Sequence, residues 1–169
     1  MIGDFNNDGN DDLAGLNSFG LIYYTTNLGT WTQITGTLAQ LVVGDLNDDG
    51  CDDFSGLNSQ GHIYAATDLI QWNQTPGTLS FLLSADLSGD GAADLAGFNS
   101  LGHVYYTTDR NTWENIPGEF VHLASGNFDP ANGLDLAGVN EQGDLFYTTN
   151  LQYWNLIPAI STPFGHGVD

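Results

Sequence analysis

A short stretch rich in oxygen-bearing side chains recurs four times along this chain, and its starts lie 41 residues apart each time. The first copy runs from Asp4 to Asp12, and later copies begin at Asp45, Asp86 and Asn127. A fixed period of this length is typical of solenoids and propellers, in which each repeat stacks on its neighbours to bury an apolar face. The fold must therefore be built from four equivalent units.

Each unit contains four short extended runs, which in the second unit cover 41–44, 54–57, 62–67 and 71–74. The runs are rich in Val, Ile, Tyr, Thr and Trp and are separated by Gly, Asn and Asp, as β-strands and their turns are. Four short antiparallel strands per repeat are typical of one propeller blade, whereas β-solenoid repeats are usually shorter. The sequence therefore predicts an all-β fold, a β-propeller of four-stranded antiparallel blades.

The period also sets the domain organisation. We predict a single β-propeller, or propeller segment, over 1–169, with repeats at approximately 3–43, 44–84, 85–125 and 126–166. The first unit lacks its first strand, and Phe164 falls where Leu41, Leu82 and Leu123 fall, so 161–169 is a possible ring-closing inner strand. The blade total stays open between a four-bladed ring, two paired copies with eight blades, and part of a larger parent. An open row would present edges for oligomer or filament growth.

In the first three loops, carboxylate, amide or hydroxyl oxygens occupy positions 1, 3, 5 and 9, and Gly at position 6 permits a sharp bend. A backbone carbonyl at position 7 completes the way in which a short loop wraps Ca²⁺. The alternative is an Asx-rich turn that tolerates Asp and Gly, but three near-complete copies favour Ca²⁺ in a structural role. The sequence thus predicts about three Ca²⁺ sites, with the following ligands: Asp4, Asn6, Asp8, Asn10 and Asp12; Asp45, Asn47, Asp49, Cys51 and Asp53; Asp86, Ser88, Asp90, Ala92 and Asp94.

The copies differ in ways that bear on metal binding. Position 7 uses only its backbone carbonyl, so Cys51 requires no thiol chemistry. Ser88 replaces Asn at position 3 and is a weaker ligand. In the fourth copy Ala131 removes the position-5 ligand, and we expect that loop to fold without a tightly held cation. The weak or empty fourth site comprises Asn127, Asp129 and Asp135.

The chain is strongly acidic, with 21 Asp and Glu against one basic residue and a formal net charge of −20. Such a surface argues against nucleic acid and anionic membranes, since both need a cationic footprint. No apolar run is long enough for a transmembrane helix, and a single cysteine allows no intrachain disulfide. Met1 leads directly into the first loop without a signal peptide, as in a mature or excised segment. Reliance on Ca²⁺ loops suggests an extracellular or cell-surface setting, without membrane insertion.

A tryptophan recurs at one position in every unit. Packing between blades is the simpler interpretation, because large flat side chains fill wedge-shaped gaps. Sugar recognition is the sharper one, since a sugar needs an aromatic face for its C–H groups and planar amides or carboxylates for its hydroxyls. Each unit also offers an Asn that can equally open a hairpin turn, and an Asn or Asp before its last strand. The candidate ligand-binding residues are Trp31, Trp72, Trp113, Trp154, Asp68 and Asp109.

Two other positions bear on packing and on pocket character. An aliphatic residue recurs in the third run of each unit, where packing between blades is expected. Arg110 replaces a leucine of the other units, so it either gives one pocket a different character or stands as a lone solvated charge. The aliphatic position comprises Ile22, Ile63, Val104 and Leu145.

The Asp-x-Asn-x-Asp-Gly-x-x-Asp loops follow short apolar strands and precede Leu-Ala-Gly at 13–15 and 95–97. This pattern resembles the FG-GAP/VCBS repeats of calcium-binding β-propellers, the class that includes the integrin α-subunit head and integrin-like lectins. The resemblance covers all four units. It implies Ca²⁺ in the loop between the first two strands of each blade, and roles that range from adhesion to glycan binding. Fold resemblance alone leaves the function open.

The leading hypothesis is a calcium-stabilised, carbohydrate-binding (lectin-like) propeller module. The alternative is a non-catalytic structural or adhesive module that mediates protein binding or self-assembly. The expected partners are a glycan or a surface protein, and a homo-oligomer or filament is possible. The sequence contains no Ser/His/Asp arrangement, no phosphate loop with Lys and no zinc-ligand spacing. Metal binding accounts for the Asp pairs, so we predict no enzyme.

Overall fold

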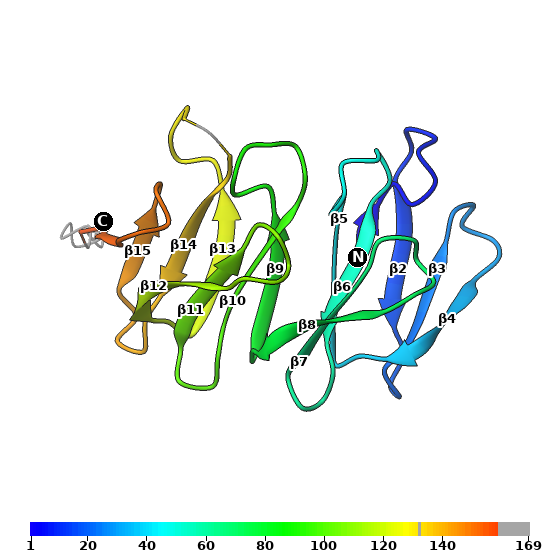
Figure 1. Ribbon diagram of the computed structural model, residues 1–169, viewed down its shortest axis with the longest axis horizontal. Helices are drawn as coiled ribbons and strands as arrows, with labels where there is room; N and C mark the ends of the chain where they lie inside the picture. The colour runs from blue at the N-terminus through cyan, green and yellow to red at the C-terminus, as the bar shows by residue number, and fades with distance from the viewer. Residues whose placement is uncertain (132, 159–169) are drawn as a thin grey trace, which may run out of the picture.

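In the computed structural model, which describes residues 1–131 and 133–158, the chain forms four antiparallel sheets of four strands each (Figure 1). Each sheet takes its strands in chain order, so one sheet corresponds to one repeat. No helix occurs in this described part, and hence none that could cross a membrane. The predicted all-β fold of four-stranded antiparallel blades is confirmed, while the segment 161–169 lies outside the described residues.

We number the blades in chain order. Blade 1 comprises β1 (Ile2–Gly3), β2 (Asp12–Leu16), β3 (Leu21–Thr25) and β4 (Thr32–Thr37). Blade 2 comprises β5 (Gln40–Gly44), β6 (Asp53–Leu57), β7 (His62–Ala66) and β8 (Asn73–Thr78). Blade 3 comprises β9 (Phe81–Ala85), β10 (Asp94–Phe98), β11 (His103–Thr107) and β12 (Glu114–Glu119). Blade 4 comprises β13 (His122–Gly126), β14 (Asp135–Val139), β15 (Leu145–Thr148) and β16 (Asn155–Leu156).

The second and third strands of each blade form a hairpin whose turn depends on one asparagine. In blade 3 the Oδ1 atom of Asn99 accepts hydrogen bonds from the backbone N–H groups of Leu101 and His103, at 2.9 and 3.1 Å. Gly102 supplies the left-handed residue, with φ of 81°, which glycine adopts without steric cost. The turn-forming interpretation of these asparagines is confirmed. In two hairpins the Nδ2 group also has a partner, since that of Asn140 donates to Asp144 Oδ2 at 3.3 Å and that of Asn58 lies 3.4 Å from His62 Nδ1.

The four blades lie side by side in a row. The first strands are neighbours in space, with β1 against β5, β5 against β9, and β9 against β13. Blades 1 and 4 occupy opposite ends of the long axis, and the Asp-rich loops follow one edge of the row while the hairpin turns follow the other (Figure 1). The described residues therefore form an open row in which each blade packs only on its chain neighbours.

The core consists of three apolar clusters, one at each junction between blades. The aliphatic position of the third strand is fully buried in the first three blades, where Ile22, Ile63 and Val104 are 0–1% exposed. Leu145, its equivalent in blade 4, is 41% exposed. The expectation that this position packs between blades is thus correct three times and wrong at Leu145, because no further blade covers it among the described residues.

The first strand of blade 1 is not absent, as the sequence predicted, but is shortened to the two residues of β1. This shortening gives a matched pair of glycines for a stability test. At Gly97, a Cβ atom would collide with the carbonyl oxygen of Phe81 and lie 2.9 Å from Leu79 Cδ1. At the equivalent Gly15, a Cβ atom would meet nothing within 4 Å.

We therefore expect Gly97→Ala to lower the free energy of unfolding by about 1–3 kcal/mol, the usual cost of overpacking. Gly15→Ala should change it by less than about 0.5 kcal/mol. Urea denaturation followed by tryptophan fluorescence measures both. Equal losses in the two variants would contradict this account of the first strand.

Candidate functional site

Three equivalent pockets lie at the three junctions between blades. Their volumes are about 390 Å³ between blades 1 and 2, 480 Å³ between blades 2 and 3, and 630 Å³ between blades 3 and 4. Cavities of this size are typical of small-molecule sites. Because the pockets repeat with the blades, any ligand that fits one of them meets closely related surroundings in the others.

Each pocket lies between two blades, and both blades contribute residues to its walls. The following blade contributes the recurrent tryptophan, an aromatic residue of its third strand and the asparagine of its hairpin turn. The preceding blade contributes the end of its fourth strand, around Gly36, Gly77 and Gly118. The shared contributions of the following blades are Asn58, Tyr64 and Trp72; Asn99, Tyr105 and Trp113; and Asn140, Phe146 and Trp154.

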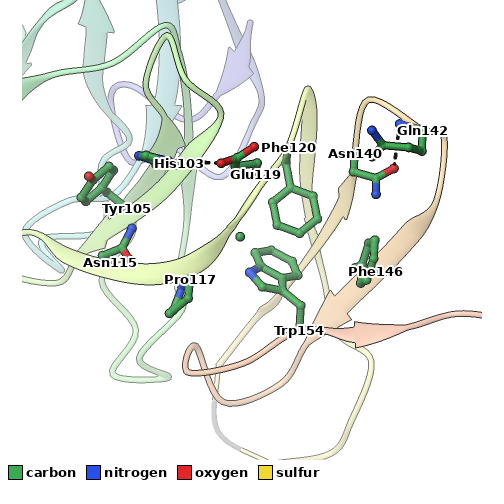
Figure 2. Close-up of a pocket in the computed structure, with 11 residues that line it drawn as sticks. His103, Tyr105, Asn115, Pro117, Glu119, Phe120, Asn140, Gln142, Phe146 and Trp154 are labelled. Atoms are coloured by element: carbon green, nitrogen blue, oxygen red, sulfur yellow. Dashed lines mark hydrogen bonds and ion pairs between the residues drawn. The ribbon is translucent and has the colours of Figure 1, made fainter.

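Two of the tryptophans pack on the glycine of the preceding blade: Trp154 tightly on Gly118 and Trp72 more loosely on Gly36, whereas a Cβ atom at Gly77 would have no Trp113 atom within 4 Å. A Cβ atom at Gly118 would lie 3.1 Å from Trp154 Cδ1 and 3.2 Å from its Nε1, so this glycine provides the room that the indole needs. Figure 2 shows Trp154 facing Phe120, and their ring centroids are 4.2 Å apart. The buried indole N–H groups of Trp72, Trp113 and Trp154 have no hydrogen-bond partner among the described residues, and an unpaired buried donor costs free energy.

The pocket between blades 3 and 4 differs from the others in charge. His103 Nε2 lies 3.5 Å from Glu119 Oε1 at its rim (Figure 2). No charged side chain is among the described residues that line the other two inter-blade pockets. This pair, and not Arg110, gives one pocket a different character.

The structure brings three of the six predicted ligand-binding residues into pockets. Trp72, Trp113 and Trp154 line them, whereas Trp31 is 51% exposed on blade 1, where no blade precedes it. Asp68 and Asp109 lie in the turns before the fourth strands and line none of the three inter-blade pockets.

The two aspartates act as turn acceptors. Asp109 Oδ1 accepts hydrogen bonds from the N–H groups of Thr112 and Asn111, at 2.7 and 2.8 Å, and from the Thr107 hydroxyl. These bonds hold the pKa of Asp109 well below its usual value. The N–H groups of Gln71 and Ile70 lower the pKa of Asp68 in the same way. Stabilisation of the local turn thus explains both carboxylates without a ligand.

The sequence interpretation missed the contribution of the fourth strand. The signal was present, because a glycine recurs two residues before Leu38, Leu79 and Phe120, at the same 41-residue spacing. Only the packing of one blade on the next reveals that Gly36 and Gly118 face the tryptophans of the following units.

The Asp-rich loops hold their shape with their own backbone N–H groups. In the first loop Asp4 accepts hydrogen bonds from Asn6, Asp8 and Gly9, at 3.3, 3.2 and 2.8 Å. Asp45 does the same in the second loop. The sixth position is left-handed as predicted, with φ of 81° at Gly9 and 87° at Gly50. These are the bonds of an Asx-rich turn.

The final Asp of each loop is buried at the start of the second strand. Asp12, Asp53, Asp94 and Asp135 are only 2–3% exposed, and each accepts a hydrogen bond from the second loop residue. Burial raises the pKa of Asp53 to about 6 and also raises that of Asp94. Burial and the neighbouring Asp49 carboxylate raise the pKa of the Cys51 thiol, which agrees with the absence of a thiol role.

The donor set of the first three loops has the chemistry of a hard-cation site, with oxygen ligands alone. Among the described residues, however, no group of three or more His, Cys, Asp or Glu is gathered as a ready metal site. The loops would therefore have to turn carboxylate oxygens inward to hold Ca²⁺. In the fourth loop Asp135 accepts from Phe128 and Asp129, and Asp129 accepts from Ala131, while residue 132 lies outside the described part.

The loops also join neighbouring blades. The carbonyl oxygens of Asp4, Asp45 and Asp86 accept hydrogen bonds from the eighth residue of the next loop, at 2.7, 2.6 and 2.5 Å. The donors are Asp52, Ala93 and Leu134. In addition, the Arg110 guanidinium donates to the carbonyl of Leu46 in the second loop. Arg110 is half-buried and lines none of the three inter-blade pockets, and its guanidinium links blade 3 to blade 2.

Comparison with known families assigns residues 7–158 to the Tectonin domain. The chain belongs to the Tectonin domain family. The match spans nearly all of the four blades, so the pockets described above lie entirely within the Tectonin domain.

The resemblance to FG-GAP/VCBS repeats is therefore wrong. The resemblance was based on the Asp-rich loops, and the structure of these loops explains why it misled. Their Asp, Asn and Gly residues satisfy the backbone N–H groups and left-handed positions of a tight turn. A turn of this kind selects the same residues wherever it occurs, so the pattern is not specific to one propeller family.

A crystal structure of BBS1N in complex with ARL6DN, soaked with mercury, is similar to this Tectonin chain. The TM-score is 0.62 at 14% identity, and the match covers 90% of this chain and 49% of that chain. At this identity the likeness concerns the fold alone, and the chain spans about half the length of that neighbour. Comparison with curated proteins gave no match.

The backbone at Arg110 gives a test of how the blades are linked. Its φ is 59°, and the equivalent Leu28, Leu69 and Leu151 have φ of 54–58°. Leucine is therefore compatible with this left-handed position, whereas a β-branched side chain is strained there.

We expect Arg110→Leu to change the free energy of unfolding by less than about 1 kcal/mol, because a leucine can pack as Leu69 and Leu151 do. Arg110→Val should lower it by about 1–3 kcal/mol through backbone strain. Chemical denaturation of the two variants beside the native chain measures the difference. A valine variant as stable as the leucine variant would show that the position is not held left-handed.

Proposed function

We propose that this Tectonin domain is a carbohydrate-binding, lectin-like module whose inter-blade pockets bind sugar residues. The observation that carries the proposal is the repetition of one chemical surface at three junctions. Each surface combines a half-buried tryptophan, a Tyr or Phe ring and an asparagine in a cavity of a few hundred Å³. A binding module fits this arrangement better than an enzyme.

Sugar is the ligand class that suits these pockets. Aromatic faces pack against the C–H groups of a pyranose ring, and planar amides bond its hydroxyls. Asn99 uses its Oδ1 atom in the turn, which leaves its Nδ2 hydrogens as donors.

Repetition makes weak pockets useful. Three equivalent sites on one rigid row can engage several sugars of one branched or crowded glycan, and linked sites gain affinity through effective concentration. This expectation suits glycans displayed on a surface, so an extracellular or cell-surface setting goes with the proposal. The pocket between blades 3 and 4, with its His103–Glu119 pair, is expected to differ in preference from the other two.

A glycan array followed by titration calorimetry tests the proposal. Replacing Trp72, Trp113 and Trp154 together by Phe keeps an aromatic filler but removes the larger indole face and its N–H. We expect binding of a sugar identified on the array to weaken at least about tenfold in the triple variant, equivalent to about 1.4 kcal/mol.

Tyr153→Phe is the matched control, because Tyr153 is an exposed aromatic next to Trp154 that lines none of the three pockets. Its affinity should equal that of the native chain. A chain that binds no glycan on the array, or a triple variant that binds as the native chain does, would contradict the proposal.

We also propose that the first three loops bind Ca²⁺ in a structural role. Support comes from the oxygen donors at alternate positions and from the left-handed bends at the fourth and sixth positions, as at Asn7 and Gly9. Neutralising part of the −20 charge would relieve repulsion among the carboxylates. Ca²⁺ that binds only the folded chain adds to its stability.

We expect Ca²⁺ to raise the melting temperature and EDTA to reverse the rise. A site filled at a hundredfold excess over its Kd contributes about 2.7 kcal/mol. Combining Asp8→Asn, Asp49→Asn and Asp90→Asn should remove most of this gain, because these exposed position-5 carboxylates are predicted ligands. Asp129→Asn in the fourth loop is the control and should leave the gain intact. A melting temperature that is the same in Ca²⁺ and in EDTA would exclude the sites.

A further inference from the structure

The outer face of blade 4 exposes apolar side chains whose equivalents are buried in every other blade. Phe128 is 51% exposed, whereas its equivalents Phe5, Leu46 and Leu87 are 2–5% exposed. Ile157 is 40% exposed, and Leu145 is similarly uncovered. We refer to Phe128, Leu145 and Ile157 as the blade-4 end face. It is the surface that every earlier blade turns toward its successor.

Blade 1 exposes the opposite half of the same interface. Leu13 is 37% exposed, while its equivalents Phe54, Leu95 and Leu136 are completely buried. Leu28 and Trp31 are 70% and 51% exposed, although the equivalent Leu69 and Trp72 pack against the cluster between blades 1 and 2. Leu13, Leu28 and Trp31 form the blade-1 end face.

The internal junctions show how the two end faces fit each other. Phe5 of blade 1 and Leu69 of blade 2 belong to one cluster, as do Leu87 of blade 3 and Leu151 of blade 4. Phe128 occupies the same position of the 41-residue repeat as Phe5, and Leu28 occupies the same position as Leu69. The two end faces are therefore complementary halves of a junction that the chain already forms three times.

The backbone hydrogen bond that joins neighbouring loops also has an equivalent acceptor and donor at the two end faces. The carbonyl of Asp86 accepts from the N–H of Leu134 in the next loop. The equivalent carbonyl at the end of blade 4 belongs to Asn127, and the equivalent donor in blade 1 is Asp11. Blades 1 and 4 of one chain lie at opposite ends of the row (Figure 1), so a single chain in this form does not join them.

We propose that the blade-4 end face of one copy docks on the blade-1 end face of a second copy, and that two such junctions close an eight-bladed ring. An end-to-end contact uses different patches on the two partners, and it forms a ring where its rotation closes. Eight blades lie within the usual range of propellers, whereas a third copy would exceed it. Ring closure also covers the apolar faces that a free row leaves in water.

Docking would also cover the pocket-forming side chains of blade 1. Trp31, Tyr23 and Asn17 occupy the positions that Trp72, Tyr64 and Asn58 occupy in the first inter-blade pocket.

Light scattering coupled to size exclusion tests the assembly at physiological ionic strength, where screening limits repulsion between the acidic chains. Over about 1–100 µM, mass action should favour a complex of twice the 18.1 kDa chain mass at the upper end. Leu28→Asp and Phe128→Asp, each at one end face, should both yield particles of 18.1 kDa. Circular dichroism confirms that each variant keeps its strands.

Mixing the two variants distinguishes this arrangement from other contacts. The intact blade-4 end face of Leu28→Asp can meet the intact blade-1 end face of Phe128→Asp, so the mixture should form a one-to-one complex that neither variant forms alone. Ile70→Asp is the control, because Ile70 is 72% exposed on blade 2, which has a neighbour on both sides. It should assemble as the native chain does.

The remaining outcomes overturn the proposal. A native chain that stays at 18.1 kDa over the whole range would show that the end faces do not meet. An open series of growing species would exclude the closed ring. Loss of assembly in only one end-face variant, or in Ile70→Asp, would exclude the end-to-end arrangement. None of these results depends on sugar binding.

Discussion

The packing of one sheet face against the next is the interaction on which this structure depends. A single four-stranded blade has no core of its own, and each of the three apolar clusters draws its members from two adjacent blades. Burial at a junction therefore stabilises both blades at once, as in other repeat proteins. The same dependence explains why equivalent residues differ so much in exposure. Leu145 has the surroundings of Val104 on its own sheet but no successor blade to cover it.

Hydrogen bonds between the loops fix the spacing that this packing requires. A carbonyl after the first strand of each of blades 1, 2 and 3 accepts an N–H from the loop of the next blade, so one edge of each of the three junctions is fixed. Toward the other edge, Trp72 and Trp154 lie against Gly36 and Gly118 of the preceding blades. The inter-blade pockets are a consequence of this geometry. They occur where two flat sheets that are joined at one edge leave room beside a large side chain.

The period of the repeat determined most of what could be predicted from the sequence. It located the four blades, the hairpin asparagines and the left-handed glycines, because each of these depends on residues close in the chain. The family was misjudged for the same reason, since the Asp-rich loop reports a local turn and not a lineage. The glycines of the fourth strands and the exposure of Trp31 escaped prediction. Both depend on which blade lies opposite, and that information is spread over residues about one repeat apart.

The distribution of charge along the row bears on what the pockets can bind. The Asp-rich loops follow one edge of the molecule, and the hairpin turns that supply the pocket asparagines follow the other (Figure 1). A chain of net charge −20 would repel an anionic ligand at long range. The two pockets between blades 1, 2 and 3 are lined by neutral residues throughout their described walls. The negative charge of the protein repels phosphate and carboxylate ligands, while aromatic faces and amides suit uncharged polyhydroxylated ones. The sugar ligands proposed above fit this charge distribution. Glu119 adds a further carboxylate at the rim of the third pocket, beside His103, and so disfavours an anionic ligand there as well.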